Sequence, residues 1–186
     1  MQELCKTLPT GPLCKYMNIK NNKHHLRIWA KNERKKCSCD LGLIEKLVET
    51  DEYRAANHIM LFYPMKDEVN LLPLLNDKTK KFYLPKIDGK TLLCCPYSGE
   101  DELCLSRFNT QEPATNPVNP NLIDLIIVPA LAVDINNYRL GYGGGFYDRF
   151  LCDKKAVKVV CIPKELVVAS INPDKYDIPV DIVITA

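Results

Sequence analysis

The spacing of hydrophobic residues changes along the chain, and this change predicts where helices and strands lie. Between Asn22 and Lys36 the apolar residues follow helical spacing, with Leu26, Trp29 and Ala30 on one side. The same spacing returns between Asp40 and Arg54, after a short polar break. We therefore expect two consecutive amphipathic helices in this part of the chain.

Further along, apolar residues form short runs that are bounded by turn residues, as is typical of buried strands. Helical spacing recurs at Asp67 to Asn76 and at Phe146 to Leu151, whereas the proline-rich stretch from Glu100 to Asn121 is expected to be a long surface connection. Strands alternating with helices predict an α/β fold: an open, mainly parallel sheet flanked by helices, in three layers and a single domain. The predicted strands are His58 to Tyr63, Lys81 to Leu84, Thr91 to Tyr97, Ile123 to Val128, Val157 to Cys161 and Asp181 to Thr185.

The domain organisation follows from length and periodicity. A chain of 186 residues is long enough for one domain with a sizeable core. Residues 1–19 contain two prolines and a glycine and show no hydrophobic period, so we expect an irregular tail there. The folded domain is predicted to cover residues 20–186.

Nine cysteines could suggest a metal or redox protein, but their pattern does not support either. Their number is odd, no Cys-x-x-Cys pair exists and no histidine pair follows at the spacing of a zinc site. No apolar run reaches the roughly 18 residues that a membrane helix needs. We expect a cytoplasmic protein with reduced thiols, no membrane partner and a monomeric state.

Charge is unevenly distributed, although the formal net charge is only +2. Residues 15–36 carry eight basic residues against a single acid, Glu33. A basic helix can bind nucleic acid, bind a polyanionic small molecule or simply face solvent. Because the chain as a whole is not strongly basic and holds no nucleic-acid reader motif, a nucleic-acid partner is disfavoured.

The segment Arg139 to Leu151 contains the strongest chemical signal, because four of the chain's eight glycines lie within five positions of it. It follows the apolar run Ile123 to Ala130 and precedes the predicted helix at Phe146. Glycines between a strand and a helix allow several backbone N–H groups to converge on a phosphate. Asp148, three residues after the last glycine, is placed to hold a metal ion on those phosphates. The run matches neither a Walker A loop nor the usual dinucleotide fingerprint, and a flexible surface loop is the alternative.

Read as a whole, the run RLGYGGGFYDRFL, preceded by IDLIIVPALAVD, closely resembles the signature of the 5-formyltetrahydrofolate cyclo-ligase family. Weaker matches extend from about Lys23 to about Ile184. The resemblance implies an ATP- and Mg²⁺-dependent cyclisation of 5-formyltetrahydrofolate to 5,10-methenyltetrahydrofolate, with ADP and phosphate released. In that reaction the formyl oxygen is phosphorylated and N10 then closes the ring, so no protein nucleophile is required.

The resemblance also assigns residues to ligands. Lys23 and Arg27 would contact ATP phosphates, Tyr63 and Glu68 would contact the folate, and Asp148 with Asp181 would hold Mg²⁺. The remaining ATP-binding positions are Arg139, Leu140, Gly141, Tyr142, Gly143, Gly144, Gly145, Phe146 and Tyr147.

Each of these residues also has a plainer interpretation. Lys23 could be a solvated charge, Glu68 could favour the first turn of a helix, and Asp148 could cap one. Asp181 could be a turn residue at a strand end, and the aromatic residues of the glycine segment could belong to the core. At the level of function, two rivals stay open: a nucleotide- or folate-binding protein without catalysis, and a nucleic-acid-associated module.

Overall fold

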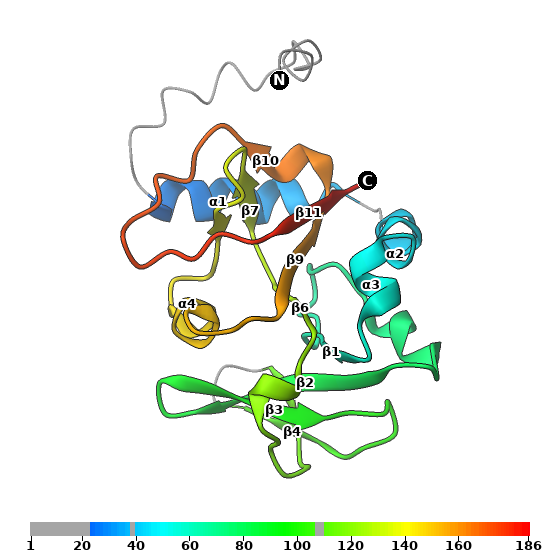
Figure 1. Ribbon diagram of the computed structural model, residues 1–186. Coiled ribbons are helices and arrows are strands. Elements are labelled where there is room, and N and C mark those ends of the chain that lie inside the picture. Colours follow the sequence, from blue (N-terminus) through cyan, green and yellow to red (C-terminus); the bar gives the residue numbers. More distant parts are fainter. Residues whose placement is uncertain (1–22, 38–39, 107–109) are drawn as a thin grey trace.

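The computed structural model describes residues 23–37, 40–106 and 110–186, so the predicted tail lies outside the described residues. Its centre is a six-stranded sheet with the order β11-β9-β6-β1-β2-β3, in which only β2 and β3 pair antiparallel (Figure 1). The mainly parallel α/β architecture predicted from the sequence is thereby confirmed. The strands are β1 (His58–Met60), β2 (Lys81–Asp88), β3 (Thr91–Pro96), β6 (Leu125–Ile127), β9 (Val157–Ile162) and β11 (Ile182–Thr185).

Successive side chains along each strand point to opposite faces of the sheet and pack into two hydrophobic cores, one on each face. In β6, Ile126 joins one cluster, whereas Leu125 and Ile127 join the other. Helices α1 (Lys23–Arg34) and α4 (Phe146–Leu151) cover the first face, and α2 (Asp40–Val48) with α3 (Asp51–Ala55) covers the second (Figure 1). The result is the three-layer arrangement expected from the sequence.

The second predicted helix is interrupted, because Thr50 ends one helix and begins the next. Thr50 has extended backbone angles, and its side chain accepts a hydrogen bond from the N–H of Tyr53 at 3.2 Å, which caps α3. The same hydroxyl donates to the carbonyl of Leu47 at 2.7 Å and so satisfies a group at the end of α2.

Of two other predictions about the connections, one was wrong and one missed local structure. Only the 3₁₀ helix η2 (Leu72–Asn76) forms in the expected helix from Asp67 to Asn76. Pro73 has no N–H to donate to the carbonyl of Val69, as a continuous α-helix would require, and the Asn70 side chain accepts from the Leu72 N–H in a competing turn. The expected surface connection contains an antiparallel pair, β4 (Leu103–Leu105) with β5 (Gln111–Pro113), and the short 3₁₀ helix η3 (Pro120–Leu122).

A second, three-stranded sheet was not predicted from the sequence. It has the order β10-β7-β8, formed by β7 (Ala132–Asp134), β8 (Arg139–Leu140) and β10 (Val167–Val168), the last preceded by the 3₁₀ helix η4 (Lys164–Leu166). Asp134 builds its hairpin: the buried carboxylate accepts from the N–H groups of Asn136, Tyr138 and Ile171 at 2.9, 3.0 and 3.1 Å. These bonds fix the direction in which the chain enters the glycine segment.

The strand order also indicates where a ligand would bind. The chain runs outward from β1 through β2 to β3, then returns to the other side of β1 with β6 and continues to β9 and β11. The order therefore reverses between β1 and β6, and open α/β sheets bind ligands at the carboxyl ends of the strands beside such a reversal. The segments that leave those two ends contain Glu68 and Ala130.

Two further findings concern the expected cellular setting. No helix within the described part of the chain is long and apolar enough to cross a membrane. The six cysteines that the structure describes are free, and three of them, Cys94, Cys95 and Cys161, are buried. Burial raises the pKa of the Cys94 and Cys161 thiols to about 12, so both stay protonated and unreactive at neutral pH.

Candidate active site at the carboxyl edge of the sheet

The glycine segment forms a tight turn, residues 141–145, between β8 and α4, and we call it the glycine turn. Gly143 and Gly145 have φ angles of 103° and 65°, which residues with a Cβ rarely adopt. The predicted position before a helix is thus correct, but the strand immediately before the turn is β8 of the small sheet. The apolar run Ile123 to Ala130 lies one hairpin earlier.

Arg27 of α1 lies against the glycine turn. Its Nε donates to the carbonyl of Gly141 at 2.8 Å, and its Cζ lies 3.4 Å from the position that a Cβ on Gly143 would take. The fold therefore brings together two parts of the predicted ATP site that are more than a hundred residues apart in sequence.

Lys23, one turn before Arg27, is held by a different partner. Its Nζ donates to Asp177 at 2.5 Å and to Asp174 at 3.1 Å. Burial disfavours the charged amine, but the bonds to Asp177 and Asp174 outweigh it and raise the pKa of Lys23. The two predicted phosphate contacts thus share a helix face, and their hydrogen bonds go to different segments: Arg27 bonds to the turn, and Lys23 bonds to Asp174 and Asp177.

Arg139 and Asp148 form an ion pair at the far end of the turn, with Nη2 and Oδ1 3.0 Å apart. Arg139 is buried, and its Nη1 donates to the carbonyl of Ile178 at 2.8 Å. Asp148 Oδ1 also accepts from the N–H of Ile178 at 3.3 Å. This pair ties β8, α4 and the segment before β11 together.

The two predicted metal ligands differ in how they are engaged. The hydrogen bonds of Asp148 within the described residues use Oδ1, so Oδ2 is left for a ligand. Asp181 Oδ2 accepts from the backbone N–H and the amine of Lys158, at 2.7 and 3.1 Å, at the amino ends of β9 and β11. Asp181 lies three residues after Ile178, so the chain brings it within about 10 Å of the segment that touches Asp148.

Asp148 therefore fits a role as one carboxylate ligand of a nucleotide-bound Mg²⁺, which typically takes one or two carboxylates together with phosphate oxygens. Within the described residues no group of three or more histidines, cysteines and acids could hold a metal alone. A bound ion at this position would need the phosphates of the nucleotide, and the role of Asp181 stays a prediction.

Glu68 lies at the reversal of strand order, after the carboxyl end of β1. Its side chain is 5% exposed, and its two oxygens accept from different donors. The Tyr142 hydroxyl donates to Oε1 at 2.8 Å, and the Met65 N–H donates to Oε2 at 2.9 Å. Tyr63, the other predicted folate contact, packs against the core on the α2 face.

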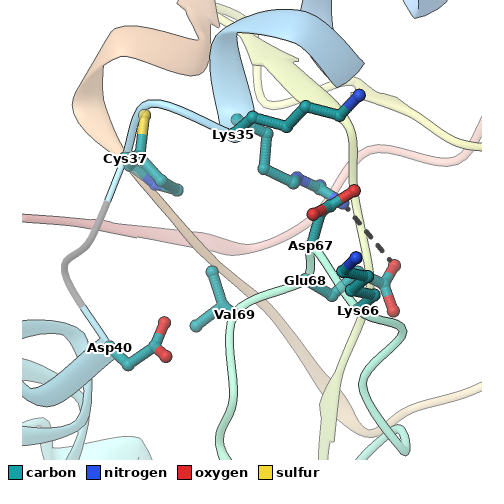
Figure 2. A pocket seen from close by; sticks show the side chains of 9 residues that line it. Lys35, Cys37, Asp40, Lys66, Asp67, Glu68 and Val69 are labelled. Carbon is teal, nitrogen blue, oxygen red and sulfur yellow. Dashed lines mark ion pairs between the residues drawn. The ribbon is translucent and has the colours of Figure 1, made fainter.

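A pocket of about 190 Å³ opens beside Glu68. In Figure 2, Lys66, Asp67 and Glu68 gather on one side of it, and Cys37 and Asp40 lie across from them. The remaining lining residues are Arg34, Lys35, Val69 and Pro163. Basic and acidic side chains are balanced here, so the pocket favours a polar ligand without a strong preference for charge.

The aromatic residues of the glycine segment divide between the core and the site. Phe146 packs against the core, and the hydroxyl of Tyr147 is buried without a hydrogen-bond partner in the described residues. Burial, and then the charge of Glu68, raises the pKa of both Tyr147 and Tyr142, so both keep their hydroxyl proton at neutral pH.

Two arginines of the site were missed by the sequence analysis. Arg34 is 7% exposed and contacts both Tyr142 and Glu68, and Arg149 donates to the carbonyls of Gly144 and Lys90. A signal for Arg34 was present, because it follows Leu26 and Ala30 at four-residue spacing on the apolar face of α1. A charge on such a face must find a buried partner.

Comparisons with known proteins identify the family of this chain. The sequence profile of the 5-formyltetrahydrofolate cyclo-ligase family matches residues 20–186. The chain is 32% identical to the 5-formyltetrahydrofolate cyclo-ligase of Mycoplasma genitalium over 131 residues, covering 68% of this chain and 71% of that protein. It is 26% identical to the mouse protein of the same name over 178 residues, covering 86% and 87%.

The fold is likewise shared with solved structures. The 5,10-methenyltetrahydrofolate synthetase of Aquifex aeolicus superposes with a TM-score of 0.78 at 32% identity, covering 88% of this chain and 89% of that one. The synthetase of Mycoplasma pneumoniae superposes with a TM-score of 0.71 at 23% identity, covering 88% and 98%. The chain belongs to the 5-formyltetrahydrofolate cyclo-ligase family.

Proposed function

We propose that this protein cyclises 5-formyltetrahydrofolate to 5,10-methenyltetrahydrofolate with ATP as co-substrate, releasing ADP and phosphate. The observation that carries the proposal is the meeting of two parts at one edge of the sheet. The glycine turn lies against Arg27, and its Tyr142 hydroxyl reaches the buried carboxylate of Glu68 at 2.8 Å. A phosphate site and a site for a polar heterocycle are therefore neighbours.

The reaction requires the nucleotide and the folate to bind side by side. A formyl oxygen on N5 is a poor leaving group, and transfer of the γ-phosphoryl group makes it a good one. N10 of the same folate then attacks the activated carbon: the N10–C bond forms, the C–O bond to the phosphate breaks, and N10 loses its proton as phosphate departs. Because both reacting groups come from the substrates, the protein contributes chiefly position and charge.

On the nucleotide side, we assign the phosphates to the glycine turn and Arg27. Positive φ angles at Gly143 and Gly145 leave room for close approach of the backbone, and the Arg27 guanidinium lies beside them. Lys23 lies one helical turn away and would add a second cation once it leaves Asp177. A bound Mg²⁺, held by Asp148, would supply further neutralisation of the phosphates.

On the folate side, we assign Glu68 to the pterin ring. An ionised carboxylate has about four lone-pair sites, and Tyr142 and Met65 use one on each oxygen. One site on each oxygen is left, which is the arrangement that two parallel N–H donors of a pterin require. The neighbouring pocket provides a polar wall next to this contact.

The test is the ATP-dependent growth of the methenyl product's absorbance, with ADP measured in the same reaction. Product and ADP formed in equal amounts would support the proposal. Folate or nucleotide binding without ADP release would select the non-catalytic binding protein. A salt-dependent shift of an oligonucleotide, without either ligand binding, would select the nucleic-acid module.

A further inference from the structure

The surroundings of Glu68 contain a hydrogen-bonded chain that includes Arg34, a residue to which the proposed reaction assigns no role. The Arg34 Nη1 donates to the Tyr142 hydroxyl at 3.0 Å, and that hydroxyl donates to Glu68 Oε1 at 2.8 Å. The guanidinium and the carboxylate themselves are 3.8 Å apart, an ion pair marked by the dashed line in Figure 2. The tyrosine oxygen thus bridges the two charges.

Arg34 is rigidly placed for this contact. Its side chain is 6% exposed, and its Nη2 donates to the carbonyl of Ala130, which follows β6. Glu68 follows β1, so the guanidinium spans the point where the strand order reverses. A buried carboxylate without a cation is costly, and Arg34 is the cation paired with Glu68 among the described residues.

Tyr142 is unusual within the glycine turn, because its hydroxyl bonds to residues outside the turn. Its ring is contacted by Lys31, whose Nζ lies 5.4 Å from the ring centre, and its oxygen contacts only the Arg34–Glu68 pair among the described residues. Gly141 and Gly143 on either side carry the contact with Arg27. One short segment therefore contacts both proposed ligand sites.

We propose that Tyr142 and Arg34 are positioning residues for Glu68, so that the glycine turn orients the folate-binding carboxylate as well as receiving the nucleotide. This inference rests on the proposed function. Its consequence is specific: removing the tyrosine hydroxyl weakens folate binding and leaves ATP binding nearly unchanged, although Tyr142 belongs to the proposed ATP-binding turn.

The test measures the binding of 5-formyltetrahydrofolate and of ATP separately, by calorimetric titration of the full chain, with steady-state KM values for both. Tyr142→Phe should weaken folate binding about tenfold, the lower end for loss of a hydrogen bond to a charged group, and change ATP binding less than twofold. Arg34→Gln should do the same, and Arg34→Lys should recover part of the loss.

Two controls separate the bridge from a general disturbance of the turn. Lys31→Gln removes the cation over the Tyr142 ring and keeps the hydroxyl, so folate binding should stay within twofold of wild type. Arg149→Gln removes a contact with the Gly144 carbonyl and should weaken ATP binding more than folate binding.

A double-mutant cycle decides whether the tyrosine acts through Glu68. In a Glu68→Ala background, Tyr142→Phe should cost nothing further, because the carboxylate that the tyrosine hydroxyl contacts is already gone. Additive losses, or a Tyr142→Phe variant that loses ATP affinity and keeps folate affinity, would overturn the inference while wild-type turnover upholds the proposed function. Should Arg34→Gln not fold, Tyr142→Phe alone carries the test. A wild-type protein that neither binds the folate nor forms product refutes the proposed function and this inference together.

Discussion

The two ends of the site are built in different ways. At the nucleotide end, the glycine turn is one continuous segment, and a single helix brings Arg27 to it. At the folate end, Arg34, Glu68 and Tyr142 come from three segments that the fold brings together, and the Arg34 and Glu68 side chains are almost completely buried. The nucleotide end is therefore visible as a motif in the sequence, whereas the folate end forms only when the fold brings distant segments together.

This difference affects how each end responds to mutation. The nucleotide end depends on backbone shape, so its glycines should be sensitive and its exposed charges more tolerant. At the folate end, the buried charges of Arg34 and Glu68 neutralise each other, and the Tyr142 hydroxyl bonds to both. Removing any one of these side chains leaves the other two without one of their partners. We therefore expect the largest single-residue effects at Glu68.

Glu68→Gln should have the largest effect. The substitution keeps the side-chain shape but removes the charge that Arg34 and the pterin donors face. Two hydrogen bonds to a charged group, each contributing about 1.5–3 kcal/mol, imply a loss in folate kcat/KM of roughly a hundredfold or more. Steady-state kinetics with folate varied at saturating ATP measures this.

The matched comparison for Glu68 is its neighbour. Asp67→Asn changes an exposed carboxylate on the same pocket wall, which lacks the contacts with Arg34 and Tyr142, and should have a far smaller effect. Equal losses for Asp67 and Glu68 variants would show that the pocket responds to total charge and not to the buried triad.

Gly143→Val should come next, with its effect on the nucleotide. At a φ of 103° a β-branched residue is strained, and its Cβ would lie 3.4 Å from the Arg27 Cζ. Strain of about 1–3 kcal/mol, together with displacement of Arg27, should raise the ATP KM roughly tenfold or more. Folate binding should change less than ATP binding, because the variant keeps the Tyr142 hydroxyl that contacts Glu68.

Gly89→Val provides the control for that experiment. Gly89 also has a positive φ, 57°, in the turn between β2 and β3, and no atom lies within 4 Å of a Cβ placed there. It should lower the thermal unfolding temperature by a similar amount and leave both KM values unchanged. If Gly143→Val shows only that same stability loss, the glycine turn serves folding alone.

Arg27→Gln should have a moderate effect, again confined to ATP. Loss of a charged contact to phosphate predicts an ATP KM about tenfold higher. Arg54→Gln, on the helix that covers the opposite face of the sheet, removes an exposed arginine as the control. The experiment contradicts the placement of the phosphates if both variants behave alike.

The sequence predicted the central sheet because its strands are continuous apolar runs, and it predicted the glycine turn because glycine tolerates the required φ angles. It did not predict β7, β8 and β10, since two- and three-residue strands leave almost no periodic signal. The helix expected from Asp40 to Arg54 is divided at Thr50, because the Thr50 side chain caps a new helix although the helical spacing of apolar residues continues. Arg34 carried a local signal of burial, but its partners, Glu68 and Tyr142, are defined only by tertiary structure.

The smallest effect is expected at the ion pair that holds Lys23. Asp177→Asn removes the nearer carboxylate and leaves Asp174 as the acid that holds the amine, so the nucleotide can draw it away more easily and we expect an ATP KM equal to wild type or up to about twofold lower. The pair should contribute less than about 1 kcal/mol to the free energy of unfolding, because it is only partly buried.

The pH dependence of that contribution identifies Lys23 as its source. The folded-state pKa of Lys23 is raised above its ordinary value of 10.5, because the bonds to Asp177 and Asp174 outweigh the opposing effect of burial. Stabilisation from a raised pKa is complete below the unfolded pKa and disappears as pH rises through the folded pKa. The difference in unfolding free energy between wild type and Asp177→Asn should therefore be constant from pH 7 to 9 and shrink above pH 10.5, as urea titrations would measure. A difference that persists undiminished at higher pH would show that Asp177 stabilises the fold through its bond to the Asp174 N–H instead.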